Sequence, residues 1–377
     1  MKTNSILKIF GLTVVLGETE KSSKYCKSLF TGVLFLILCF FSCTKPASPV
    51  VEIISVDTDN TQLVDISKGQ KIELETTDSS LLYDISRIEF LKEKIIVLSR
   101  EKVSVFDENG KFLFNISSKG EGPQEYINLA NVFIKNEQIH LIDQMSKKIL
   151  CYDENGNFVS STKINENNQY PISDLFPLEN GKYIGKNMFQ GDQNLVPVGC
   201  ILDEEYNFVG TIEGRKILSG ITKHDNFYQY KDRILYWEIL NDTIFSIEDY
   251  QSVIPKYFVD FGNHSIPKNN GDIYDLINYS SQPENINKIA GFIGNIIEND
   301  TYLMFRFMFK KQVHYVFYDK QRKNARIFRF EDSNREYYTT PCVCYHNGYI
   351  YLTIMSETDL EKNPYLIVFE ENIFTKI

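Results

Sequence analysis

Positive charge is in short supply in this sequence. Its 377 residues contain 40 Lys and Arg against 50 Asp and Glu, which gives a formal net charge of −10. A protein that binds nucleic acid needs a basic surface to neutralise phosphates, so we predict no nucleic-acid partner. Hydrophobic residues make up 43% of the chain and charged residues 24%, and this balance excludes wholesale disorder.

The motifs of several enzyme and metal-binding classes are missing as well. The 7 Cys form no Cys-x-x-Cys pair, which argues against zinc-ribbon and thioredoxin chemistry. The 5 His have no His-Glu-x-x-His spacing, and the chain has neither a Gly-x-Ser-x-Gly elbow nor a phosphate loop ending in Gly-Lys-Ser/Thr. We therefore predict no catalytic residue, no metal ligand and no cofactor. Calcium stays open without a motif to support it, and spacing does not exclude a metal site assembled from distant segments.

The N-terminus has the layout of an export signal. The mostly apolar run Leu29–Phe41 follows three lysines and is shorter than the roughly 20 residues of a transmembrane helix. A serine and Cys43 come next, an order that resembles a bacterial lipobox, in which the Cys receives a lipid. We predict a signal peptide over residues 1–42 with an over-long start, a lipidated Cys43 and a tether over residues 43–60. The alternatives are an ordinary signal peptide or a single membrane anchor.

A repeat runs through the rest of the chain. Val103–Ile116 and Ile149–Ile164 both contain an aromatic residue followed by Asp-Glu-Asn-Gly, and Asp107 and Asp153 are 46 positions apart. Asn-Gly between two strand-like runs predicts a hairpin with a type I′ turn, because both central residues of that turn need positive φ. Weaker copies of the same hairpin occupy Ile201–Ile212, Ile244–Asp249, Val313–Phe330 and Leu366–Ile377.

Two shorter strand-like runs precede each of these hairpins. Four short strands per unit of about 50 residues, repeated six times, is the pattern of a β-propeller. The single Trp beside 23 Tyr and 27 Phe also favours strands. We predict an all-β fold: a six-bladed β-propeller of four-stranded antiparallel blades over residues 61–377. A ring must join its ends, so we expect an N-terminal strand to close the last blade.

Three segments resemble a known family. They are Ser86–Phe90, Val105–Phe112 and Lys119–Tyr126. In these the chain resembles the six-bladed β-propeller lipoproteins of Bacteroidetes, relatives of NHL-repeat propellers. The resemblance implies export and a binding or scaffold role, and it supplies no catalytic set.

Polar residues at the ends of the second strands form the candidate binding site. Strand order brings these positions to one rim of a propeller, and they are Arg100, Gln144, Asn187, Glu238, Arg306 and Ser356. Trp237 stands next to Glu238 and could stack on a sugar or a side chain. Glu125 and Tyr126 in the loop Gly120–Tyr126 are further candidates. The alternatives are strand ends that are polar because they meet water, a Trp237 packed between blades, and a purely structural loop.

These features favour a binding role over catalysis. We expect an exported, lipid-anchored propeller at the outer membrane, facing the periplasm or the cell surface, that binds a glycan, a peptide or an envelope protein. The alternative is a propeller enzyme, such as a glycan lyase or a lactonase-like hydrolase, with a cross-blade metal or acid/base site. A third reading is a structural module of a larger envelope complex. The sequence predicts no oligomeric state.

Overall fold

The chain divides into two units, Met1–Val50 and Val51–Ile377. The computed structural model describes residues 5–9, 12–16 and 51–376, with gaps at 84, 101, 165–171, 188–194, 219–225, 239, 251, 268–277, 332–336 and 357–360. In the first unit, β1 (Ser5–Ile9) and β2 (Leu12–Leu16) form an antiparallel hairpin. The apolar run Leu29–Phe41 and Cys43 lie outside the described residues, so the predicted signal peptide and lipid anchor stay predictions.

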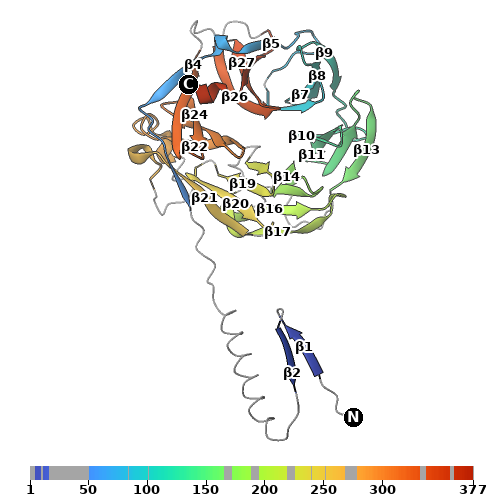
Figure 1. Ribbon diagram of the computed structural model, residues 1–377. Helices are drawn as coiled ribbons and strands as arrows, with labels where there is room; N and C mark the ends of the chain where they lie inside the picture. The colour runs from blue at the N-terminus through green and yellow to red at the C-terminus, as the bar shows by residue number, and fades with distance from the viewer. Residues whose placement is uncertain are drawn as a thin grey trace. The chain divides into compact units, whose positions relative to one another are not determined.

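Six further sheets make up the second unit and form a ring, which confirms the predicted six-bladed β-propeller (Figure 1). Each blade is an antiparallel sheet whose strands follow one another along the chain. The first blade contains β6 (Arg87–Leu91), β7 (Lys94–Ser99), β8 (Lys102–Asp107) and β9 (Phe112–Ile116). The second contains β10 (Leu129–Lys135), β11 (Gln138–Asp143), β12 (Lys148–Tyr152) and β13 (Phe158–Lys163). The third contains β14 (Ile172–Pro177), β15 (Tyr183–Asn187), β16 (Leu195–Leu202) and β17 (Phe208–Leu218).

The remaining three blades repeat this order. The fourth contains β18 (Phe227–Tyr230), β19 (Arg233–Trp237), β20 (Thr243–Glu248) and β21 (Ser252–Asp260). The fifth contains β22 (Gly291–Glu298), β23 (Tyr302–Phe309), β24 (Gln312–Asp319) and β25 (Asn324–Glu331). The sixth contains β26 (Tyr337–His346), β27 (Tyr349–Ser356) and β28 (Tyr365–Glu370). A short helix, α3 (Ile373–Lys376), follows β28 where the sequence predicted a further hairpin strand.

The segment before the first blade supplies the missing strand. β5 (Gln70–Glu73) pairs antiparallel with β28 and closes the sixth blade, as expected. The run Val51–Asp57 is strand-like in sequence and contains β3 (Glu52–Ser55), but β3 adds in parallel to β21 instead of closing the sixth blade. A further strand that was not anticipated, β4 (Thr61–Asp65), adds in parallel to β25. The propeller sheets therefore begin at β3, and the expected boundary at residue 61 is too late. We call residues 51–73 the outer strap, because they extend three successive blades at their outer edges (Figure 1).

The Asp-Glu-Asn-Gly hairpins differ from the expected type I′ turn. Of the two central residues, only Gly110 has a positive φ, at 87°, and its amide donates to the Asp107 carbonyl at 3.0 Å. The Asp107 carboxylate accepts the amides of Asn109 and Lys111, each at 2.9 Å. This is a three-residue hairpin loop in which a left-handed glycine follows the turn. Because the Asp side chain satisfies the loop amides, its place in the repeat serves the turn and needs no bound ion.

The core consists of six hydrophobic clusters, one between each pair of neighbouring blades. A blade buries both faces, one against each neighbouring blade. Successive side chains of a strand point to opposite faces, so they pack alternately into two different cores. Trp237, for example, packs with Phe305 and Phe307 between the fourth and fifth blades.

Candidate functional site

Strand direction fixes which polar residues can meet. The first strand of every blade lies nearest the propeller axis (Figure 1). Because the strands alternate in direction, the start of the first strand and the end of the second strand lie at the same end of the ring. We call this end the connection rim, since the links from one blade to the next also cross it.

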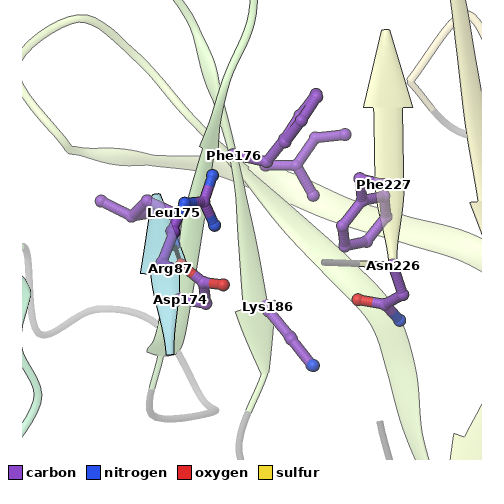
Figure 2. A pocket seen from close by; sticks show the side chains of 8 residues that line it. Arg87, Asp174, Leu175, Phe176, Lys186, Asn226 and Phe227 are labelled. Carbon is purple, nitrogen blue, oxygen red and sulfur yellow. Dashed lines mark hydrogen bonds between the residues drawn. The ribbon is translucent and has the colours of Figure 1, made fainter. Parts of the chain in front are cut away.

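A pocket opens at the connection rim beside the axis. Its lining comes from three blades and comprises Arg87, Asp174, Leu175, Phe176, Ile184, Lys186, Asn226 and Phe227 (Figure 2). The enclosed cavity is only about 10 Å³, room for about one water molecule, within about 250 Å³ of empty space that includes open solvent. Arg87 begins β6, Asp174 lies near the start of β14, Lys186 lies near the end of β15, and Asn226 immediately precedes β18. The pocket therefore exists only once the ring has closed.

Charged side chains of both signs line the pocket. Lys186 and Asp174 are each only 7% exposed. The Asp174 carboxylate accepts the amide of Leu175 at 2.7 Å and a hydrogen bond from the side chain of the buried Asn131. Arg87 donates from Nε to the Glu89 carboxylate at 2.6 Å. Hydrogen bonds from its own sheet and from the second blade thus hold Asp174 in place, and the lining carries two cationic side chains against one anionic one.

Asn226 is the most informative residue of the pocket. It is 5% exposed, and neither its Oδ1 nor its Nδ2 has a hydrogen-bond partner in the part of the chain that the structure describes. Its backbone carbonyl accepts the Trp237 amide at 3.2 Å, which holds the main chain while the side chain lines the pocket (Figure 2). A buried polar group without a partner costs about 1–3 kcal/mol. Such a group calls for an explanation, and either an ordered water or a ligand would complete its bonding.

Apolar side chains form the rest of the lining. Phe176 and Phe227 come from neighbouring blades, and their ring centroids are 6.1 Å apart. Leu175 and Ile184 are buried beside them. A pocket that combines apolar walls with a few fixed polar groups is the usual form of a small-molecule site.

The predicted rim residues that the structure describes lie in different surroundings. Arg100 is exposed and its guanidinium lies 4.6 Å from the ring centroid of Tyr83. Gln144 is half-buried, and its backbone amide donates to the Asn128 carbonyl at 3.1 Å. The side chains of Asn187 and Ser356 lie outside the described residues.

One of the expected contact residues belongs to blade packing, and another lies within its own strand. Trp237 is 4% exposed within the cluster between the fourth and fifth blades, so its indole is a core group rather than a stacking platform. Arg306 lies inside β23 instead of following it, and a Cβ added to Gly294 would come within 3.2 Å of its Nε. The Glu238 carboxylate accepts from the Tyr236 hydroxyl at 3.3 Å and from Asn241 Nδ2 at 3.0 Å.

The loop Gly120–Tyr126 is built as a structural turn. The Glu125 carboxylate accepts the Gly122 amide at 2.8 Å, and Tyr126 is fully buried between the first and second blades. Lys148 donates to the Gly122 carbonyl at 2.9 Å. Glu125 and Tyr126 therefore hold their own loop, as the structural alternative proposed.

Sequence reasoning approached the pocket but missed its residues. It selected Asn187, one position beyond Lys186, because it considered only residues that follow a second strand. Arg87 and Asp174 are charged residues near the starts of innermost strands, and this position could have drawn attention to them. Asn226 had no such signal, because an Asn before a short strand is also a common loop residue.

Several other polar side chains pair with one another. The buried Glu298 carboxylate accepts from Arg233 at 2.6 Å, from Lys320 at 2.6 Å and from the Tyr257 hydroxyl at 2.7 Å, which ties the fourth blade to the fifth. His140 stacks on Phe133 with centroids 5.0 Å apart, and burial lowers its pKa to about 4. Within the described ranges there is no group of three or more His, Cys, Asp or Glu able to hold a metal ion. Among the same residues no helix is long and apolar enough to cross a membrane.

Two solved structures share the propeller fold. A putative exported protein from Bacteroides fragilis matches with a TM-score of 0.60 and 17% identity, over 85% of this chain and 99% of its own. A member of the family named duf4221 from Bacteroides vulgatus matches with a TM-score of 0.51 and 12% identity, over 80% and 97%. No curated protein matches the sequence. A family model described as "Domain of unknown function (DUF4934)" matches residues 49–375, and the chain belongs to that family.

Proposed function

We propose that the protein is a non-catalytic, exported binding module that takes up a small ligand in the pocket at the connection rim. The observation that carries this proposal is the buried side chain of Asn226, whose amide has no partner among the described residues and which lines a pocket beside Lys186 and Asp174. Stability alone does not explain such a group, because an apolar residue of the same shape would avoid its desolvation cost. A ligand that completes its hydrogen bonds explains it.

The second part of the proposal concerns the location of the protein in the cell. The sequence places Cys43 directly after a short apolar run and a serine, and the Bacteroides fragilis protein of the same fold is described as exported. We propose that lipid on Cys43 anchors the propeller to the outer membrane. Residues 44–50 then separate the lipid from the outer strap, and the anchored propeller would present its ligand in the cell envelope, as a peptide, a glycan or part of an envelope protein.

A binding screen tests the proposed function. Peptides, N-acylated amino acids and glycans are titrated into the Cys43→Ala chain, with and without calcium, and binding is followed by calorimetry. The same series is repeated with Lys186→Leu in that background, and Arg100→Leu serves as a matched control because Arg100 lies outside the pocket. We expect at least one ligand to weaken about tenfold with Lys186→Leu and to be unchanged with Arg100→Leu. A screen in which every ligand binds both variants equally, or none binds, contradicts the proposal.

A further inference from the structure

We infer that two copies of this chain associate through the outer edges of their second blades, with β13 of one copy antiparallel to β13 of the other. This inference goes beyond the proposed function, because β13 contributes no residue to the lining of the pocket. It combines the uncovered edge of β13, the direction of its backbone groups and the charges at its two ends.

β13 is an outer strand without a cover in the part of the chain that the structure describes. The outer strands of the last three blades pair with the outer strap. In the first blade, the Glu75 carboxylate accepts the Phe112 amide at 2.8 Å and the Ser79 carbonyl accepts from the Asn115 side chain at 2.6 Å, so the segment after β5 shields β9. Every residue of β13 from Val159 to Lys163 is exposed. Such an open edge is a template for pairing with another chain.

The hydrogen bonds between β12 and β13 fix which backbone groups face outward. Ile164, directly after β13, donates its amide to the Lys147 carbonyl at 2.9 Å, and the paired register continues from there through β13. Hydrogen-bonded and non-hydrogen-bonded positions alternate along an antiparallel pair. The backbone N–H and C=O groups of Ser161 and Lys163 therefore point away from the blade, where a second strand can reach them.

A two-fold axis selects one register for two identical strands. In a symmetric antiparallel pair one residue lies opposite its own copy, and Ser161 is the outward-facing residue in the middle of the exposed run. The two Ser161 residues then exchange N–H···O=C bonds. Lys163 lies opposite Val159 of the partner subunit, so the 49% exposed valine gains the aliphatic part of a lysine as a neighbour and no like charges face each other.

The two ends of this edge carry opposite unpaired charges. Lys147 and Lys163 lie at the connection-rim end, both exposed and without an ion-pair partner within the described ranges. Asp153 lies in the hairpin turn at the other end, where it accepts turn amides, while the neighbouring Glu154 is paired with Lys92 at 2.5 Å. Antiparallel pairing places the basic end of each copy beside the acidic turn of the other, so the contact is attractive at both ends.

Cysteine cross-linking tests the register, with the Cys43→Ala chain as the parent. Ser161→Cys places two thiols on the two-fold axis, where opposite Cα atoms lie roughly 5.5 Å apart, within disulfide range. Val159→Cys is the matched control on the same strand, because an offset of four residues separates its two copies by roughly 14 Å. We expect oxidised Ser161→Cys to run as a covalent dimer on non-reducing gels and Val159→Cys to run like the parent. Equal cross-linking of the two variants overturns the inference.

Sedimentation equilibrium measures the association itself. One strand pair is a small interface, so we expect reversible dimers. Ser161→Pro removes the central outward N–H of each copy without touching a bond to β12, and it should raise the dissociation constant of the dimer about tenfold or more. Lys163→Glu should also weaken the dimer, whereas Lys163→Arg should preserve it.

Circular dichroism establishes that each variant is folded, and Lys163→Glu carries the test if Ser161→Pro unfolds, because this lysine is an exposed surface residue. A parent chain that stays monomeric at every concentration overturns the inference. So does a dimer whose dissociation constant is the same for the parent and for the folded variants at Ser161 and Lys163.

Discussion

Two buried asparagines of similar exposure should respond in opposite ways to the same substitution. Asn226 is 5% exposed and Asn363 is 8% exposed. Asn363 Oδ1 accepts the Leu82 amide at 2.7 Å, and its Nδ2 donates to the carbonyls of Glu75 at 2.8 Å and Ser80 at 3.0 Å. Asn226 has no side-chain partner within the described residues. Leucine has nearly the shape of asparagine, so replacement mainly removes polar atoms.

The hydrogen bonds set the expected magnitudes. Asn363→Leu removes three bonds worth about 0.5–1.5 kcal/mol each and leaves buried backbone groups unpaired, so we expect a loss of about 3 kcal/mol of stability. Asn226→Leu removes no bond and relieves the desolvation of two polar atoms, so we expect a change between zero and a gain of about 2 kcal/mol. Such a gain in stability would mean that Asn226 is retained at a cost to folding, as expected of a residue that serves a ligand site.

Urea unfolding of the two variants beside wild type measures the difference. The midpoint should fall with Asn363→Leu and hold or rise with Asn226→Leu, with unchanged m-values. A loss with Asn226→Leu as large as that with Asn363→Leu would refute the reasoning, because it would show that the Asn226 amide already has partners in the free protein.

Four further expectations concern the packing of Trp237, the titration of a buried histidine, the closure of the ring and the membrane anchor. Trp237→Ala should cost about 3–5 kcal/mol of stability while the folded fraction keeps its ligand affinity, and weakened binding without a stability loss would restore Trp237 to the site. Burial lowers the pKa of His140 from 6.5 to about 4, so the unfolded chain takes up more protons in that interval. Stability present above pH 6.5 should therefore fall by about 3 kcal/mol toward pH 4. His140→Phe should remove that part of the pH dependence. If the stabilities of wild type and variant, measured by urea unfolding, change with pH in the same way, this expectation is contradicted. Deleting the outer strap, residues 51–73, should lower the thermal midpoint of the whole propeller, because the sixth blade loses β5 and the outer strands of two other blades go with it. An unaltered midpoint would show that the ring closes without it. Cys43→Ala should release the protein from the membrane fraction, whereas continued sedimentation with membranes would support a membrane-spanning anchor.

The fold was predictable because its determinants are local and repeated. The spacing of Asp107 and Asp153, with short strands before each, identified the blades, and the need to close the ring identified a role for the segment that became β5. The parallel pairing of β3 and the presence of β4 were missed because a parallel edge strand has neither a partner nor a turn nearby in sequence. The turn type was also missed, since the Asp107 carboxylate stabilises a different hairpin loop.

The site was less predictable for a physical reason. Both faces of a blade are buried, so strand periodicity does not distinguish a residue that packs between blades from one that faces the axis. Trp237 was assigned wrongly on this account. The pocket also joins Arg87 of the first blade to Asn226 beside the fourth, and these positions meet only in the closed ring.

Titration of the screened peptides and glycans into the Cys43→Ala chain and into the same chain with Lys186→Leu tests the central claim most directly. The account predicts at least one ligand whose binding weakens about tenfold with Lys186→Leu and is unchanged with Arg100→Leu. Equal binding of every ligand to these proteins, or no binding to any of them, would contradict it.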